Sequence, residues 1–306
     1  MNAKQSKFCH LCGQKLVGSY LIYDNSLVVC ERCNATVSRC SQCNLPSRQL
    51  TSVRNVLICP ACRQKASLCP CCRQPILGKY FIIGDSPIRY CETCVATRPR
   101  CDICRAPLDE QGKSFPDKDG PVYRCASCLQ SAVMNIGDAE RLYRETAALL
   151  QQELQLNIPR LPLLHLVDRA TLMSLNREVG LLAGPDIPLG AEHQHLLGFF
   201  QQSNEERTIF IQQLLPQMLF RAIAAHELAH AWQSFYAPPQ QPLKVVEGFA
   251  EWVAYRLLMA LGEQREAARL TRRSDLYGEG LQYFIGLERQ YGRQEVLQQA
   301  KTFLPS

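Results

Sequence analysis

The sequence predicts an α+β protein in two parts: a β-rich array of small cysteine-bearing modules, followed by a mainly helical domain with a small sheet. Seventeen cysteines occur in 306 residues, and none lies beyond residue 128. The cysteine-rich segment also repeats itself after about sixty residues. From residue 131 onward, short apolar strand candidates alternate with longer helical patterns rich in Ala and Leu. This change of pattern indicates two regions with different kinds of core.

Eight CxxC pairs contain sixteen of the seventeen cysteines, and the separations between successive pairs alternate between 15–20 residues and 6 residues. The segment that begins at Cys9 aligns with the one that begins at Cys69, so that Tyr20 falls on Tyr80. In this alignment Cys71 has no counterpart, and His10 falls opposite a proline. We therefore expect neither of them to bind a metal. The repeat predicts two double modules, residues 1–67 and 68–130, each with ligands for two metal ions.

The stretches between paired CxxC motifs are β-rich with a central turn, as in residues 19–30 and 79–91. Hairpins of this kind bring consecutive pairs together, which favours sequential sites, although a cross-braced pairing stays open. Four cysteine ligands close a zinc site, so about four structural zinc ions are expected, and they fold segments too short to bury a core. The predicted ligands are Cys9, Cys12, Cys30 and Cys33; Cys40, Cys43, Cys59 and Cys62; Cys69, Cys72, Cys91 and Cys94; and Cys101, Cys104, Cys125 and Cys128.

The charge distribution argues against nucleic acid as a partner. The first 130 residues hold 18 Lys and Arg against 9 Asp and Glu, whereas the remaining residues hold 16 against 19. A zinc ion with four thiolates carries about −2, so four such sites bring the N-terminal excess from +9 to about +1. The basic signal that would indicate nucleic-acid binding mostly disappears.

The start of the chain, MNAKQSKFCHLCG, has no apolar segment of the kind found in a secretory signal peptide. Reduced thiols in the cytoplasm are therefore expected rather than a disulfide framework. No apolar run approaches the roughly eighteen residues that a membrane span needs, so no membrane association is expected.

Residues 131–306 are predicted to form one domain. The Gly- and Pro-rich segment 180–190 is predicted to be a loop. His165 is expected to lie in the core. The strand candidate 207–215 could also pair with an extended substrate. The predicted helices are residues 138–156, capped by Asp138, then 218–235, 243–268 and part of 277–303, and the predicted buried strands are residues 161–168, 195–200 and 207–215.

The predicted helix 218–235 contains the pattern HExxH. Residues four apart share a helix face, so His226 and His230 can bind one metal ion while Glu227 points at the water that the ion carries. Glu247, on the next helix, is the predicted third ligand, and two His plus one carboxylate is a common catalytic zinc set. Glu251 shares the face of Glu247 and could accept the outer ring N–H of a ligating His.

Glu227 is the predicted general base and acid, which takes a proton from the zinc-bound water and delivers it to the leaving amine. Oxyanion stabilisation calls for a further donor, and the spacing leaves four candidates: Tyr277, Tyr283, His193 and His195. Trp232 and Trp252 follow the two motifs and are expected to be packing residues.

HELAHAW followed by VVEGFAEWVAY resembles the gluzincin metallopeptidases, in which the third ligand is a Glu four residues before an acidic residue. The cysteine modules resemble LIM domains, although here every ligand is Cys and six residues, not two, separate the second and third pairs. LIM-like modules followed by HExxHAW, an EG-containing helix and YGEG resemble the DA-one family of LIM-containing peptidases. An acidic residue often precedes the EG glutamate in that family, whereas Val246 does so here.

The resemblance implies a zinc-dependent endopeptidase with one catalytic zinc, acting on protein substrates and recruiting protein partners through the LIM-like region. In plant members of the family, ubiquitin-interacting helices precede the LIM region. Eight residues precede Cys9 here, so such helices are not expected and ubiquitin control is not carried over. Ubiquitin as a partner is an expectation from the resemblance alone. The alternative hypothesis is a zinc-built protein-interaction adaptor whose peptidase fold is inactive.

Overall fold

The computed structural model describes residues 7–84, 86–179, 196–203 and 206–302. The chain divides into two compact units, Met1–Pro99 and Arg100–Ser306. The fourth cysteine group therefore shares a unit with the C-terminal residues, although its position in the repeat places it in the second double module. The described residues form both helices and strands, and the strands make up small sheets. This agrees with the predicted mixture of α and β structure.

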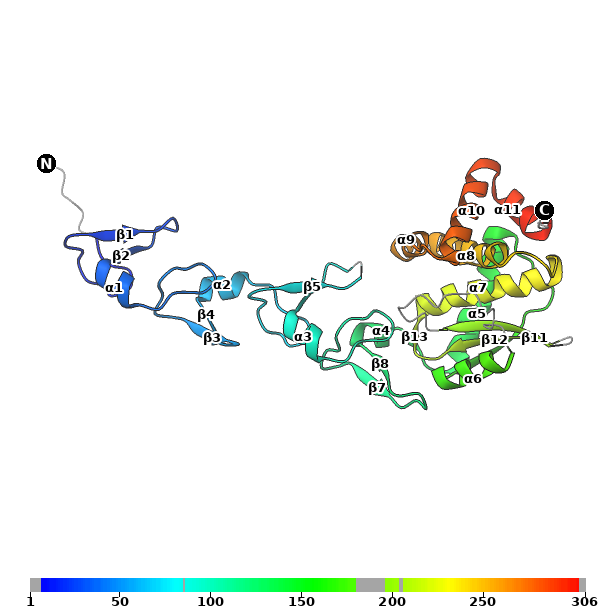
Figure 1. Cartoon of the computed structure of the whole chain (residues 1–306), viewed down its shortest axis with the longest axis horizontal. Helices are drawn as coiled ribbons and strands as arrows, with labels where there is room; N and C mark the ends of the chain where they lie inside the picture. The colour runs from blue at the N-terminus through cyan, green and yellow to red at the C-terminus, as the bar shows by residue number, and fades with distance from the viewer. Residues whose placement is uncertain (1–6, 85, 180–195, 204–205, 303–306) are drawn as a thin grey trace. The chain divides into compact units, whose positions relative to one another are not determined.

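Each cysteine group combines a two-stranded antiparallel hairpin with a short helix (Figure 1). The third cysteine ends or directly follows the second strand and precedes the helix, and the fourth lies inside that helix. The hairpins are β1 (Tyr20–Ile22) with β2 (Val28–Cys30), β3 (Thr51–Val53) with β4 (Val56–Ile58), β5 (Tyr80–Ile82) with β6 (Arg89–Cys91), and β7 (Lys113–Phe115) with β8 (Val122–Arg124). The helices are α1 (Glu31–Thr36), α2 (Pro60–Lys65), α3 (Glu92–Thr97) and α4 (Ala126–Gln130).

The cysteines come together sequentially, as the predicted hairpins require. Within each of the four groups, the sulfur atoms of two consecutive CxxC pairs lie within 4.8 Å of one another. The cross-braced alternative is not formed. The hairpins predicted over residues 19–30 and 79–91 are β1–β2 and β5–β6.

A three-stranded sheet in the second unit has the order β10-β12-β11. Strand β10 (Leu163–Val167) is parallel to β12 (Glu206–Gln212), and β11 (Gly198–Ser203) is antiparallel to it. Because β12 has a neighbour on each edge, the expectation that residues 207–215 pair with a substrate is wrong. The β10 strand is only partly buried, and His165, expected in the core, is exposed and stacks on Phe210 at 5.2 Å between ring centroids.

Seven longer helices and one short strand pair complete the described part of this unit. The helices are α5 (Ile136–Leu154), α6 (Arg169–Val179), α7 (Gln217–Tyr236), α8 (Leu243–Ala260), α9 (Gln264–Thr271), α10 (Leu276–Tyr291) and α11 (Arg293–Thr302). The short antiparallel pair is β9 (Ala132–Val133) with β13 (Leu215–Pro216).

The structure corrects the predicted helix ends. The N-cap of α5 is Asn135, whose side chain accepts from the N–H of Asp138, so Asp138 lies in the first turn. The helix expected over residues 243–268 is two helices, because Gly262 adopts a left-handed φ of 79° between α8 and α9. Gly292, with a φ of 86°, divides α10 from α11 in the same way. Helix α6 was not expected, and the predicted loop 180–190 lies outside the described residues.

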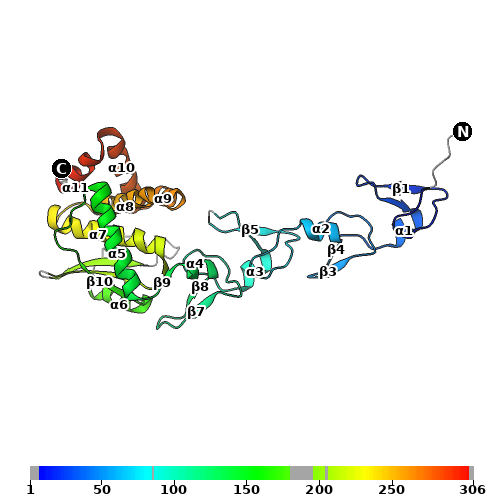
Figure 2. The same ribbon diagram turned by 180° about the vertical axis from the view of Figure 1, so that it is seen from behind.

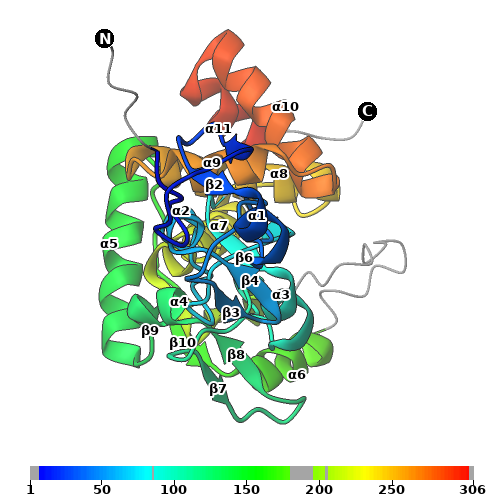
Figure 3. The same ribbon diagram turned by 90° about the vertical axis from the view of Figure 1, so that its left-hand side faces the viewer.

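Helix α7 lies at the centre of the unit, with the sheet on one side and α8 on another, while α6 covers the opposite face of the sheet (Figures 1 and 2). Helix α5 runs along the side of the unit (Figure 3) and packs against α7. Trp232 and Trp252 are 3% and 0% exposed in this core, which confirms the packing role predicted for them. Among the described residues, no helix is both long and apolar enough to span a membrane.

Candidate metal centre

Helix α7 places His226, Glu227 and His230 at the centre of the second unit. Its alanines Ala224, Ala225 and Ala229 are fully buried, and such small side chains allow close packing of the neighbouring helices. Most of the circumference of the helix is apolar, so the helix is buried on most of its sides. The polar side chains of HExxH therefore belong to a helix that is largely surrounded by the core.

Helix α8 supplies Glu247 from its second turn. Pro242 starts this helix, and Gly248 directly follows the carboxylate. A Cβ atom at Gly248 would lie 2.6 Å from the backbone of Gly280 on α10. Gly248 and Gly280 thus allow α8 and α10 to cross at a short distance, which brings α10 close to Glu247.

The three predicted ligand atoms converge. His226 Nε2 lies 3.1 Å from His230 Nε2, and Glu247 Oε2 lies 3.2 Å from His226 Nε2 and 3.5 Å from His230 Nε2. Around a tetrahedral zinc ion with bonds of about 2.05 Å, neighbouring ligand atoms are about 3.3 Å apart. The three atoms therefore fit three corners of such a site.

The charge of the site favours a cation. Burial lowers the pKa of His230, but the Glu247 carboxylate outweighs it and raises this pKa to about 9. Burial also lowers the pKa of His226, but the bond to Glu247 together with the charges of Glu227 and Glu251 outweighs it and raises this pKa. Burial opposes ionisation of Glu247, yet the two imidazoles hold its pKa well below the usual range. Positive charge at this point, whether protons or a metal ion, is stabilised by Glu247.

Gln233 orients His230, a contact that the sequence analysis missed. The side-chain N–H of Gln233 donates to the carbonyl of Val246 at 3.0 Å, which leaves Gln233 Oε1 to accept from His230 Nδ1 at 2.9 Å. This bond places the proton on Nδ1 and leaves a lone pair on Nε2, the atom that faces Glu247. The signal in the sequence was the spacing, since residues three apart on a helix are neighbours.

Glu227 is 5% exposed and interacts electrostatically with His226, His230 and Glu247. Burial raises its pKa above the usual range, and the neighbouring imidazoles and a hydrogen bond from the backbone N–H of Phe200 oppose this rise. Phe200 belongs to β11, so an outer strand of the sheet passes directly beside the carboxylate. A carboxyl group with a raised pKa is suited to accept and return a proton near neutral pH.

Tyr277 is the candidate oxyanion donor that the structure brings to the site. Its ring centroid lies 6.3 Å from that of His226, and burial together with Glu247 raises the pKa of its hydroxyl. Tyr283 is 42% exposed and packs edge-on against Phe284. His193 and His195 lie outside the described residues.

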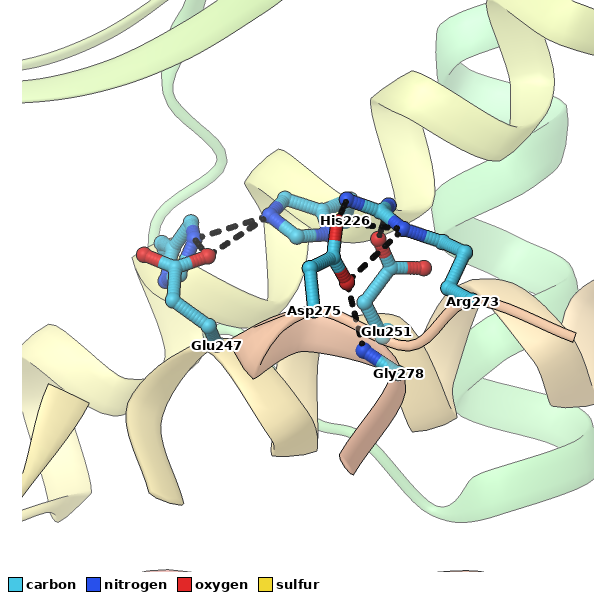
Figure 4. A network of polar contacts seen from close by, with 7 residues as sticks. His226, Glu247, Glu251, Arg273, Asp275 and Gly278 are labelled. Carbon is cyan, nitrogen blue, oxygen red and sulfur yellow. Dashed lines mark hydrogen bonds and ion pairs between the residues drawn. The ribbon is translucent and has the colours of Figure 1, made fainter. Parts of the chain in front are cut away.

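The carboxylate of Glu251 accepts a hydrogen bond from Arg273 Nη1 at 2.5 Å (Figure 4). Arg273 also pairs with Asp275, which caps α10 through the N–H of Gly278, and its guanidinium lies 4.6 Å from the ring centroid of Tyr277. Arg273 is thus the partner of Glu251 Oε1, and the bond from Glu251 to a ligating His stays a prediction. Glu251 contributes to the charge around His226 and holds the segment that carries Tyr277.

The four cysteine groups have distances suited to structural zinc. Sulfur atoms around a tetrahedral zinc with bonds of about 2.3 Å lie about 3.8 Å apart. In each of the four groups, one Sγ pair between successive CxxC motifs measures 4.0, 3.9, 3.9 and 3.5 Å, respectively. Although burial opposes the thiolate, backbone N–H bonds lower the pKa of Cys9 to about 6. These groups could hold structural zinc ions.

Arg54 adds a positive charge to the third cysteine group. Its guanidinium donates to Cys91 Sγ at 3.0 Å and to Cys72 Sγ at 2.9 Å. Arg54 lies in the turn between β3 and β4 of the preceding module, so sequence spacing gave no indication of this contact.

Five groups of His, Cys and Glu in the described part of the chain could hold a metal ion: the four cysteine groups and the group of His226, His230 and Glu247. Cys71 belongs to none of them. Neither a scan against protein-family models nor a search of curated proteins found a match to this chain.

Proposed function

We propose that the chain is a zinc-dependent endopeptidase of the gluzincin type, similar to the DA-one family. The observation that carries the proposal is the convergence of His226 Nε2, His230 Nε2 and Glu247 Oε2, with the buried carboxylate of Glu227 on the same helix. Two imidazoles and one carboxylate leave a fourth position open, which distinguishes a catalytic site from the closed cysteine sites.

A bound zinc ion would supply Lewis-acid polarisation of the substrate carbonyl and would acidify a water molecule. Glu227 accepts the proton of the attacking water on its carboxylate and then donates it to the leaving amine nitrogen. Its raised pKa suits both transfers. Tyr277, whose ring lies beside that of His226, is the proposed donor to the oxygen that gains charge, and Gln233 keeps the His230 ring in its ligand orientation.

Strand β11 is the part of the sheet suited to bind an extended polypeptide. It pairs with β12 on one side, while the N–H of Phe200 points to Glu227 on the other. An added strand on this outer edge would run past the general base, with main-chain hydrogen bonds independent of sequence. Polypeptides with an extended segment are therefore the proposed substrates.

The LIM-like modules are proposed to recruit protein partners, with ubiquitin as a candidate by family resemblance alone. The strands β1 and β5, which occupy equivalent positions in the repeat, expose Tyr20, Leu21 and Ile22, and Tyr80, Phe81 and Ile82. Exposed apolar clusters of this kind are typical of protein-binding surfaces. The same feature favours the alternative, an adaptor with an inactive peptidase fold.

Because sixteen ligand thiols must stay reduced, we propose a cytoplasmic location.

The substitution Glu227→Gln tests the proposal, because it keeps the shape of the side chain and removes its capacity to accept a proton. We expect unchanged zinc content and a fall in cleavage of a fluorescently labelled unfolded protein by roughly 10²- to 10⁴-fold. Equal cleavage by both proteins would rule out this role for Glu227. Partner capture without any zinc-dependent cleavage would instead favour the adaptor.

A further inference from the structure

The fourth cysteine group differs from the other three at one buried position. The residue before the third cysteine is apolar in the first three groups, where it is Val29, Ile58 and Tyr90. In the fourth group it is Arg124, and its exposed fraction is 0%. A buried guanidinium is costly unless its N–H groups are paired, so its partners indicate why it is there.

Arg124 links the fourth cysteine group to the segment that leads into α7. Its Nε donates to the carbonyl of Leu214 at 2.9 Å, and its Nη1 donates to the carbonyl of Tyr123 at 3.0 Å and contacts Asp102 at 3.4 Å. Asp102 directly follows the first cysteine of the group, and its carboxylate also accepts from the backbone of Tyr123 at 2.7 Å. Leu214 directly precedes β13 and α7.

Backbone hydrogen bonds also join the fourth cysteine group to the start of α7. Helix α4, which contains Cys128, leads into β9, and β9 pairs with β13 in the register Val133 to Leu215. The N–H of Gln217, the first residue of α7, donates to the carbonyl of Ser131 at 2.8 Å. Pro216, the N-cap of α7, makes no side-chain capping bond. The chain that leaves the fourth cysteine group therefore satisfies an otherwise unpaired N–H at the start of the HExxH helix.

A second attachment joins the same module to α6. The loop between β7 and β8 contributes Asp117, whose carboxylate accepts from the N–H of Ala170 at 3.3 Å, and Gly120, whose carbonyl accepts from Arg169 at 2.7 Å. Ile103, inside the CxxC motif of Cys101 and Cys104, packs against the main hydrophobic core. These contacts agree with a compact unit that begins at Arg100.

We propose that the fourth cysteine group is a structural metal site of the C-terminal domain itself, with Arg124 as the residue that joins it to α7. Loss of its metal destabilises the domain that holds His226 and Glu227, whereas loss of metal from the first group leaves that domain intact. This proposal requires metal binding by the cysteines and does not require peptidase activity.

The two tryptophans provide a selective readout in the full-length chain, because Trp232 and Trp252 are its only tryptophans and both lie in the C-terminal core. The test variant carries Cys125→Ser and Cys128→Ser, and the matched control carries Cys30→Ser and Cys33→Ser. Each variant is expected to lose one zinc ion. Denaturant unfolding followed by tryptophan fluorescence should shift to a lower midpoint, or be lost altogether, in the test variant alone. The proposal is overturned if both variants unfold at the wild-type midpoint, or if the control shifts as much as the test variant.

A second variant, Arg124→Met, keeps every cysteine. We expect zinc content to stay at the wild-type value while the folding equilibrium constant measured by tryptophan fluorescence falls roughly 10- to 100-fold, the usual effect of losing a hydrogen bond to a charged group. Arg39→Met is the control, since Arg39 bonds the carbonyl of Asn44 at 2.8 Å within the first module. A wild-type transition for Arg124→Met would show that Arg124 does not join the site to α7.

Discussion

At the scale of single residues, helix periodicity was enough to predict that the two histidines meet. His226 and His230 share a face of α7 and converge as the spacing requires. The partner of Glu251 could not be predicted in this way, because Arg273 comes from a different segment and reaches Glu251 only after α8 and α10 have packed. Gln233 was predictable from spacing, but its role depends on the carbonyl of Val246.

Replacing Gln233 with Ala should weaken zinc binding at the histidine site. The bond to His230 Nδ1 holds the ring with Nε2 toward Glu247, and loss of such a contact typically costs roughly 10- to 100-fold in metal affinity. Competition with a chromophoric chelator measures this affinity. Gln151→Ala, at an exposed position on α5, is the control and should leave it unchanged. Equal affinities in all three proteins would contradict the orienting role.

Tyr277 and Tyr283 provide a matched pair on α10. Because only Tyr277 lies beside His226, Tyr277→Phe should lower kcat by roughly 10²-fold with zinc content unchanged, which is the usual effect of removing an oxyanion donor. Tyr283→Phe should behave as wild type. Steady-state cleavage of a labelled unfolded protein measures both, and similar kcat values for the two variants would exclude Tyr277 as the donor.

At the scale of helices and strands, the sequence predicted which elements exist better than how they pair. Strand β12 is as apolar as predicted, yet its central place follows from long-range pairing with β10 and β11. The long helix predicted over residues 243–268 ends early because Gly262 adopts a left-handed conformation, which the helical pattern around it did not reveal. The close crossing of α8 and α10 likewise depends on two glycines far apart in the chain.

The crossing can be tested with two glycine substitutions. Gly248→Ala should destabilise the domain by about 1–3 kcal/mol, because its Cβ would lie 2.6 Å from the backbone of Gly280. Gly286→Ala, elsewhere on α10, has no atom within 4 Å of its added Cβ and should stabilise by up to about 1 kcal/mol through helix propensity. Denaturant unfolding measures both. Equal changes of the same sign would contradict the close crossing.

At the scale of the whole molecule, the repeat predicted all four cysteine groups because each is closed by local hairpins. The same repeat could not predict that the second compact unit begins at Arg100. Cysteine spacing places the fourth group with the third, whereas the contacts of Arg124, Asp117 and Ile103 join it to residues far along the chain. The change from an apolar residue to the buried Arg124 is a departure from the repeat that accompanies these contacts.

Metal content should reflect the difference between closed and open sites. We expect about five zinc ions per chain, one for each group, with four retained and one lost under mild chelation, because the histidine site has three protein ligands and the others have four. His230→Ala should reduce the total to four and abolish the labile fraction. Elemental analysis before and after dialysis against a chelator measures this, and four ions in the wild type, all resistant, would contradict the histidine site.

The bond between Arg124 and Leu214 also has a consequence for the order of folding. The sulfur contacts within the four cysteine groups join residues 16 to 21 positions apart, whereas Arg124 and Leu214 lie 90 positions apart. Short loops close sooner and at lower entropic cost than long ones. During synthesis the hairpins can therefore form while α7 is still missing. Until Leu214 emerges, Arg124 has no carbonyl to bond there, so the helix that carries Glu227 is completed after the hairpins of the cysteine groups can form.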